Sequence, residues 1–331
     1  MKVKLLFSLM VIGLMVVSCT DDKNDIASIE DIIDFENAAD VEYIVDDQVA
    51  TSRSKGRFTF KTLNQALRCT GLADVVRDQR WTIYAPSDAA FAKLGLDRDN
   101  VCSALDAETL TSILLYHVNE EKIGLKDDGC FVQINGDIIQ VVRNSFRDVR
   151  VNDTRTYLRF TSRRLSVYLI EDVLLPSENS IVETAIAADD FSILVDAVLA
   201  ADPAVVEALS DPDNVFTVLA PTNQAFVDLL GALNLSSLEE VVTAIGIEGL
   251  TNILLYHVVD ACAVSNTLEN DAIIPTLLGE EIKIDLDNLG IIDKAGSSSG
   301  LIPELLDIRT NNGVIHAIDR VLLPQAILDL L

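Results

Sequence analysis

The chain has 331 residues, a length that suits two domains of ordinary size. Its 25 Lys and Arg residues against 52 Asp and Glu residues give a formal net charge of −27, which excludes a whole-protein attraction to nucleic-acid phosphate or anionic lipid. Hydrophobic residues make up 49% of the chain at a mean hydropathy of +0.30, too much for a disordered acidic polymer. Aromatic residues make up only 5%, so we expect no nucleic-acid partner.

The N-terminus predicts export. Residues 1–18 place two lysines ahead of a short apolar run, as in a secretory signal peptide, and the run is shorter than the about 20 residues that span a bilayer. Val16-Val17-Ser18-Cys19 resembles a bacterial lipobox, which implies that the mature chain begins at Cys19 and carries lipid on its thiol. We therefore expect a bacterial envelope lipoprotein, anchored in the outer membrane and exposed at the cell surface, with residues 19–55 as an acidic tether.

Helix and strand signals alternate after the tether. Residues 62–71 predict a helix that is closed by Gly71, and residues 81–85 predict a short buried strand stopped by Pro86. A second helix follows the proline, with Ser87 or Asp88 as its cap. This part of the chain is therefore helix-rich around one buried strand.

The next segment changes period. Residues 107–116 continue as helix, whereas residues 137–142 and 165–170 alternate apolar and polar side chains with the period of two that is typical of strands. The pattern predicts an α+β domain whose second half is a sheet.

Three motifs occur twice and in the same order, which indicates an internal repeat. The matching segments are 81–91 with 216–226, 110–118 with 250–258, and 171–176 with 319–324. The offset between the copies grows from 135 to 140 to 148 residues, so one fold is copied twice with longer loops in the second copy. We expect domain one at 56–176, domain two at 177–325 and a C-terminal tail at 326–331.

These motifs resemble those of the fasciclin domain. They read Ala-Pro-Ser/Thr-Asp/Asn-x-Ala-Phe, Leu-Leu-Tyr-His-Val and Gly-Val-Ile-His-Ala-Ile-Asp-x-Val-Leu-Leu-Pro, and they follow the family's order. The resemblance implies two tandem α+β wedges, each a bent two-sheet β sandwich flanked by helices. It also implies an extracellular adhesion module.

The family's Tyr-His pair maps onto Tyr116-His117 and Tyr256-His257. Its last motif maps onto His316, for which the repeat offset places Tyr168 in the first copy, so the hydrogen bonding of that histidine should be altered in domain one. A histidine repeated within an apolar run favours a buried, hydrogen-bonded residue over a general base. The resemblance leaves open a partner contact through the two tyrosines.

Two other patterns suggest chemistry that we set aside. Gly296-Ser-Ser-Ser-Gly300 fits a nucleophile elbow around Ser298, but a run of small polar residues between two strand-like stretches favours a mobile loop. Residues 285–290 begin like a calcium loop, but Leu289 and Gly296 stand where an EF-hand needs ligands. The sequence also lacks Cys-x-x-Cys, so a zinc site lacks its usual ligand spacing. With these patterns set aside, we expect no enzyme activity, no resident metal and no cofactor.

Export permits disulfides among the four remaining cysteines, Cys69, Cys102, Cys130 and Cys262. Four cysteines allow three pairings, and the sequence does not choose between them. Because three of the four lie in the first half of the chain, Cys69 with Cys102 is the favoured pair.

Charge separates the two copies. Residues 56–176 carry 16 basic and 16 acidic side chains, whereas residues 178–325 carry 4 and 24, a net of −20. Strand spacing predicts a basic sheet face in domain one that would bind a polyanion through arginine forks, unless it is a solvated face or one neutralised by domain two. Its members are Arg143, Arg147, Arg150, Arg155 and Arg159.

The resulting interpretation is a non-enzymatic lipoprotein for cell adhesion or matrix contact. Its expected partners are a surface protein or an anionic glycan of a neighbouring cell or matrix, and the membrane through lipid on Cys19. The alternative is a carrier of an apolar ligand such as a carotenoid or lipid. A hydrolase rests only on the pattern around Ser298.

Overall fold

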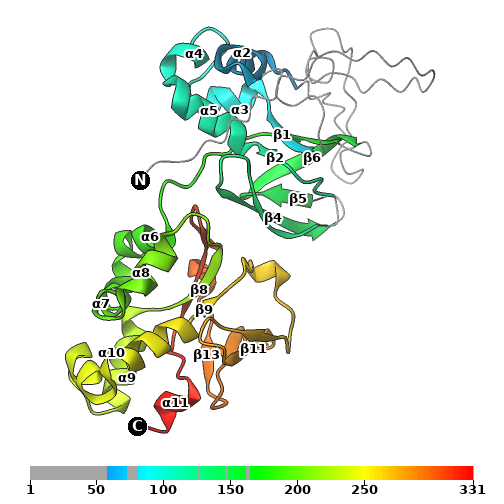
Figure 1. Cartoon of the computed structure of the whole chain (residues 1–331). Helices are drawn as coiled ribbons and strands as arrows, with labels where there is room; N and C mark the ends of the chain where they lie inside the picture. Colours follow the sequence, from blue (N-terminus) through cyan, green and yellow to red (C-terminus); the bar gives the residue numbers. More distant parts are fainter. Residues whose placement is uncertain (1–57, 73–80, 125–126, 146–147, 162–164, 331) are drawn as a thin grey trace, which may run out of the picture.

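The computed structural model describes residues 58–72, 81–124, 127–145, 148–161 and 165–330, and the expected signal peptide and tether lie outside these ranges. Figure 1 shows two units of helices and strands, one following the other along the chain, with the helices of each unit gathered beside its strands.

Three described α-helices of domain one begin where local signals predict, and the short helix at Val101–Ala104 was not predicted. The described helices are α2 (Lys61–Thr70), α3 (Asp88–Lys93), α4 (Val101–Ala104) and α5 (Ala107–Tyr116). Gly71 closes α2 in the left-handed conformation, with φ of 72°, which glycine adopts without strain. The Ser87 side chain accepts the Ala90 N–H and caps α3, so the serine of the two predicted candidates is the cap.

The strands of domain one form one continuous ladder in the order β2-β1-β7-β6-β5-β4-β3. Their bounds are Trp81–Pro86 (β1), Val118–Asn119 (β2), Gly129–Val132 (β3), Ile138–Ser145 (β4), Asp148–Val151 (β5), Thr154–Thr161 (β6) and Leu165–Ile170 (β7). The pair β1 and β7 is parallel and the other pairs are antiparallel. The long strand β6 thus joins the two sheets that were expected to be separate.

Domain two repeats the order of helices. They are α6 (Ile181–Ala187), α7 (Ser192–Ala200), α8 (Pro203–Ser210), α9 (Asn223–Ala232), α10 (Leu238–Tyr256) and α11 (Gln325–Leu328), with short 3₁₀ turns η2 (Asp189–Phe191), η3 (Ser265–Thr267) and η4 (Pro303–Leu305). Gly246, with φ of 74°, interrupts α10, so its two parts correspond to α4 and α5 of domain one.

The strands of domain two form two separate four-stranded sheets, β14-β15-β8-β9 and β10-β11-β12-β13. Their bounds are Phe216–Pro221 (β8), Val258–Val259 (β9), Ile273–Pro275 (β10), Glu281–Asp285 (β11), Gly290–Ile292 (β12), Ser298–Gly300 (β13), Ile308–Arg309 (β14) and Gly313–Ile318 (β15). The parallel pair β8 and β15 matches β1 and β7. This domain has the two sheets that the family resemblance implies.

One expectation needs correction. The run 296–300 is not a mobile loop, because Gly296 ends a turn and Ser298–Gly300 pair with β12. In the segment expected as the C-terminal tail, Ile327 of α11 is buried in the core of domain two. Within the described ranges, no helix is both long enough and apolar enough to span a bilayer.

Candidate functional site

The Tyr-His pairs end the helices α5 and α10, where each histidine is the C-terminal cap. Both histidine rings are 3% exposed. Their backbone carbonyls accept the N–H of the neighbouring strand, from Tyr84 to His117 and from Leu219 to His257, each at 2.9 Å. The motif therefore joins the end of a helix to the central parallel strands.

Both ring nitrogens of each histidine are bound to backbone. Nδ1 of His117 lies 2.7 Å from the Ile113 carbonyl, which only accepts, so Nδ1 carries the proton. Nε2 then accepts the Leu174 N–H at 2.9 Å. Nδ1 of His257 contacts Ile253 O and Nε2 accepts the Leu322 N–H at the same two distances. Burial lowers the pKa of both rings to about 4, although the carbonyl contacts oppose the shift. Both rings are neutral, and both nitrogens of each ring already have backbone partners. Neither ring is therefore suited to act as a general base.

The tyrosines of the pairs are also committed to backbone. The Tyr116 hydroxyl donates to Ile138 O at 2.7 Å and accepts from Asn152 Nδ2 at 2.8 Å. The Tyr256 hydroxyl donates to Glu281 O at 3.0 Å and accepts the Lys294 N–H at 2.9 Å. Both tyrosines are fully buried, so neither presents its side chain to a partner.

His316 and Tyr168 occupy the same place, as the repeat offset predicts. Tyr168 pairs with Tyr84 on β1, and His316 pairs with Leu219 on β8. We expected the hydrogen bonding at this place to differ in domain one. For the main hydrogen bond, that prediction is wrong. The Tyr168 hydroxyl donates to Ile123 O at 3.1 Å, and Nε2 of His316 donates to the equivalent Ala263 O at 2.7 Å.

Asp88 and Asn223 also make the same hydrogen bond through different side chains. Asp88 Oδ1 accepts the Thr62 N–H at 2.8 Å, and Asn223 Oδ1 accepts the Ile193 N–H at 2.9 Å. Each side chain thus reaches from the start of one helix to the first turn of another, α2 or α7. The substitution leaves this contact intact in both copies.

Asn312 is a structural residue that sequence reasoning did not single out. Its side chain is fully buried, accepts the Ile181 N–H at 2.9 Å, and donates to Leu209 O at 2.9 Å and Asp211 O at 3.1 Å. It therefore ties the start of α6 to the end of α8. Its position directly before Gly313, where the last of the three motifs begins, was the available signal.

The structure pairs the cysteines as Cys69–Cys102 and Cys130–Cys262. The first bridge is the favoured pair and joins α2 to α4 within domain one. The second joins β3 of domain one to the segment after β9 of domain two, across 132 residues. Once Cys69–Cys102 is chosen, Cys130–Cys262 is the pair that remains among these four cysteines, and the structure shows that both bridges form.

The arginines do not form one sheet face. Arg143 pairs across the strands with the buried Val149, whereas Arg150 pairs with Arg155 on the alternate side. Arg143 contacts Asp128 at 3.0 Å, Arg150 contacts Asp148 at 3.5 Å, and the Arg155 guanidinium lies 5.3 Å from the centre of the Tyr157 ring.

Two of the expected arginines lie beyond what the structure describes. Arg147 is outside the described residues, and so is the side chain of Arg159. A register shift between Leu158 and Phe160 also breaks the regular alternation on which the four-residue spacing relied. Cys19 likewise lies outside the described residues.

The Ser298 pattern lacks the geometry of a nucleophile elbow. Ser298 lies on β13, which pairs with β12, and the described residues between β13 and β14 form only the short 3₁₀ turn η4 and no α-helix. The neighbouring Ser299 is held by Asp319 at 3.5 Å and Arg320 O at 3.0 Å. Among the described residues, no group of three or more His, Cys, Asp or Glu side chains is placed to hold a metal ion.

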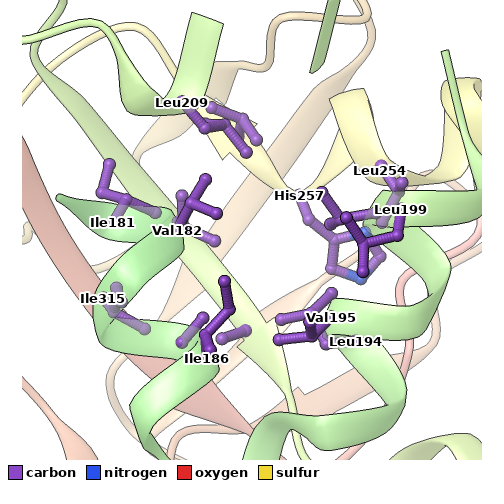
Figure 2. Close-up of a pocket in the computed structure, with 15 residues that line it drawn as sticks. Ile181, Val182, Ile186, Leu194, Val195, Leu199, Leu209, Leu254, His257 and Ile315 are labelled. Atoms are coloured by element: carbon purple, nitrogen blue, oxygen red, sulfur yellow. The ribbon is translucent and has the colours of Figure 1, made fainter. Parts of the chain in front are cut away.

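An apolar cleft lies in domain two between α6 and α7, over β8 and β15 (Figure 2). Its empty volume is about 600 Å³, including the open solvent at its mouth. The side chains labelled in Figure 2 are Ile181, Val182, Ile186, Leu194, Val195, Leu199, Leu209, Leu254, His257 and Ile315. Ile186 and Leu199 are 59% and 65% exposed. Since both nitrogens of His257 are bound to backbone, the lining is apolar in practice.

Domain one differs at this place. The shared contact to Asp88 or Asn223 aligns Thr62 with Ile193, and hence Asn64 with Val195 and Arg68 with Leu199. Polar side chains thus stand on α2 where α7 lines the cleft. The apolar periodicity of residues 181–199 was the signal that sequence reasoning did not use.

Comparisons with known proteins agree with the motifs. Human periostin is 27% identical over 84% of this chain, and the porcine transforming growth factor-beta-induced protein ig-h3 is 29% identical over 75%. The chain spans about a third of the length of these two relatives, 31% and 34%. Protein sll1483 of Synechocystis is 36% identical over 47% of this chain and 79% of its own.

A solved FAS1 domain pair from the insect cell adhesion molecule fasciclin I covers 80% of this chain and 98% of its own, at 16% identity and a TM-score of 0.40. The family model for the fasciclin domain matches residues 58–176 and again residues 189–324. Together these two matches span most of the chain, each over one copy of the repeat. The chain therefore belongs to the fasciclin-domain family and carries two such domains in tandem.

Proposed function

We propose that this protein is a non-enzymatic surface lipoprotein that acts in cell adhesion or matrix contact. The observation that carries the proposal is the state of the histidines, whose ring nitrogens are all occupied by backbone groups in the folded chain. Such residues build a scaffold, and function then resides in the surfaces of the two domains. Membership of the fasciclin family supports a binding role.

The partner is proposed to be a surface protein or an anionic glycan. Of the five arginines of the predicted basic face, Arg150 and Arg155 lie opposite one another on β5 and β6. Two guanidinium groups side by side suit sulfate or phosphate groups of a glycan. The nearby Asp148 competes for Arg150, so the contact should be weak and sensitive to salt.

A binding assay tests this function. The chain from residue 20 onward, labelled with a fluorophore, is added to bacterial cells, to matrix-coated plates and to immobilised heparin as a polyanion probe. We expect saturable binding to at least one surface, and a several-fold loss of heparin retention when Arg150 and Arg155 are both changed to Ser. Arg98→Ser, an exposed residue of domain one, is the matched control. Absence of saturable binding to any surface contradicts the adhesion proposal.

Anchoring is tested separately. We propose that Cys19 carries the lipid, as its lipobox-like context suggests. Cells fed labelled fatty acid should label the wild-type protein, and Cys19→Ala should release it from the membrane fraction. Membrane retention of the variant, with no label on the wild type, contradicts lipidation.

A second candidate function, carriage of an apolar ligand such as a carotenoid or lipid, is favoured by the cleft between α6 and α7. Its walls offer hydrocarbon contact only, so a suitable ligand places an apolar chain there. We expect a fluorescent polyene fatty acid to bind, and Val195→Asn with Leu199→Arg, the residues of domain one, to weaken binding about tenfold. Val227→Asn on α9 is the exposed control. Equal binding by the wild-type protein, the double variant and the Val227→Asn control would exclude the cleft as the binding site.

A further inference from the structure

Domain one and domain two meet around the disulfide Cys130–Cys262. Ile138 of β4 and Val264 are 1% and 0% exposed and share a buried cluster with Val314 of β15, against which both cysteines pack. Domain two thus contributes a loop, residues 261–265, to an apolar contact with the outer strands of domain one. The link is covalent and lies far from the ends of both domains in the sequence.

The loop at residues 261–265 is held by hydrogen bonds on both sides of Cys262. The Thr217 hydroxyl donates to Ala261 O at 2.7 Å and accepts the Ala263 N–H at 2.8 Å. His316 Nε2 donates to Ala263 O at 2.7 Å, while Nδ1 accepts the Asp307 N–H at 3.1 Å.

Asp307 completes this arrangement. Its carboxylate accepts the Ser265 N–H at 2.7 Å and the Ser265 hydroxyl. The backbone on each side of Cys262 therefore has little freedom, because it is held by Thr217 of β8, by His316 of β15 and by Asp307.

Domain one holds the equivalent loop in the same way. The Thr82 hydroxyl donates to Glu121 O at 2.8 Å and accepts the Ile123 N–H at 2.7 Å, and Tyr168 donates to Ile123 O. Lys122 stands where domain two has Cys262. The loop shape thus belongs to the fold, and the second copy has placed a cysteine at a position that the fold already presents.

A charge of domain two also acts on a buried group of domain one. Burial raises the pKa of the Tyr116 hydroxyl to about 12, and the charge of Arg309 on β14 partly offsets that rise. A cation of domain two therefore lies near a buried group of domain one, which is consistent with a fixed placement of β14 against the first sheet.

We propose that Cys130–Cys262 is a clamp that fixes the two domains as one rigid body, and that His316 is its positioning residue because it holds the loop that presents Cys262. The inference goes beyond adhesion and does not rest on it. The same carbonyl contact is made by Tyr168 in domain one, where no clamp is attached, so the loop contact belongs to the fold and the cysteine is what is particular to domain two.

The clamp is tested by measuring the distance between spin labels placed at Glu108 of α5 and Glu248 of α10 through unnatural amino acids in the full chain. The disulfide-bonded protein should give one narrow distribution, and Cys130→Ser with Cys262→Ser should give a distribution at least twice as broad. Cys69→Ser with Cys102→Ser, which removes the bridge inside domain one, should keep the narrow distribution. An unchanged distribution without Cys130–Cys262 overturns the proposal.

The role of His316 is tested with dithiothreitol, a dithiol that passes two electrons and two protons to a disulfide and becomes a cyclic disulfide itself. Cys69–Cys102 in the same molecule is the internal reference. His316→Phe should make Cys130–Cys262 at least fivefold easier to reduce relative to that reference. His316→Tyr, which can donate to Ala263 O as Tyr168 donates to Ile123 O, should stay within twofold of wild type.

These variants separate positioning from general stability. A merely structural histidine would lower the melting temperature in His316→Phe and leave the ratio of the two reduction equilibria unchanged, and that result overturns the positioning role. Should His316→Phe fail to fold, Thr217→Val serves instead, because it removes two contacts of the same loop with little change in side-chain shape.

Discussion

At the loop that follows the Tyr-His pair, domain one uses a tyrosine and domain two a histidine to reach the same backbone carbonyl. At the start of the helix after the buried strand, one domain uses an aspartate and the other an asparagine to accept the same N–H. The two copies therefore retain hydrogen bonds rather than residue types. What the fold demands is a donor or acceptor at a given place, because a buried backbone group left unpaired is costly.

The surfaces of the two domains differ far more than their interiors. Domain one is neutral overall and presents Asn64 and Arg68 on α2, whereas domain two carries a net charge of −20 and presents Val195 and Leu199 on α7. A shared interior with divergent surfaces is the pattern expected when each copy contacts different neighbours.

The largest expected effect is a loss of stability between pH 6.5 and pH 4. Burial lowers the pKa of His117 and His257 to about 4 in the folded chain, below the unfolded value of about 6.5. The unfolded chain therefore binds protons first, so stability is complete above pH 6.5 and falls as the pH drops toward 4. Each histidine should account for about 3 kcal/mol. Urea unfolding at half-unit pH steps measures this loss, and a flat profile contradicts buried neutral rings.

Removing one histidine sharpens the comparison. His257→Ala leaves Ile253 O and the Leu322 N–H unpaired in the core of domain two, and should cost about 3 kcal/mol. His117→Ala should cost as much in domain one, because its contacts are the same. Glu248→Ala on the exposed face of α10 is the control. A neutral effect in only one domain would show that the two copies do not share this requirement.

The two parallel strand pairs, β1 with β7 and β8 with β15, differ at one glycine. Gly313 of β15 is so close to β8 that an added Cβ would lie 2.1 Å from Phe216 O, whereas domain one has Leu165 at this position. Gly313→Ala should destabilise domain two by about 2 kcal/mol, since backbone must move. Gly231→Ala in α9 meets open space and should stabilise by up to about 1 kcal/mol. Thermal unfolding distinguishes the opposite signs.

The smallest expected effect comes from exchanging the two helix contacts. Asp88→Asn keeps an oxygen for the Thr62 N–H and should change stability by less than about 0.5 kcal/mol. Asn223→Asp should cost about 1 kcal/mol, because it loses the bond from Asn223 Nδ2 to Asp189 O at 2.8 Å. Urea unfolding measures the loss of stability in each variant. An equal loss in Asp88→Asn and Asn223→Asp would mean that the side-chain oxygen alone does not define this contact.

Much of the fold could be predicted because its signals are local or repeated. Gly71, Ser87 and the alternating residues 165–170 mark element ends and a strand directly, and the three repeated motifs identify two copies. The buried state of the histidines followed from their recurrence within an apolar run.

Other features depended on long-range geometry. Cys130 and Cys262 are 132 residues apart, and nothing in their neighbourhoods says which strand faces which loop. The prediction of a single arginine face was wrong because Arg143 pairs with the buried Val149, whereas Arg150 pairs with Arg155 on the other side of the sheet. The cleft escaped notice because helical apolar residues are ordinarily core, and only the separation of α6 from α7 leaves space between them.

All three histidines of the chain have the protonated ring nitrogen fixed by a backbone carbonyl. Nitrogen-15 NMR of histidine-labelled protein reads the protonated nitrogen of each ring. We predict Nδ1–H for His117 and His257, with no titration of either ring above pH 5.5. For His316 we predict Nε2–H and a pKa lowered by burial. A ring that titrates near pH 6.5, or one that exchanges between both tautomers, would contradict the shared backbone contacts and return that histidine to consideration as a chemical or binding group.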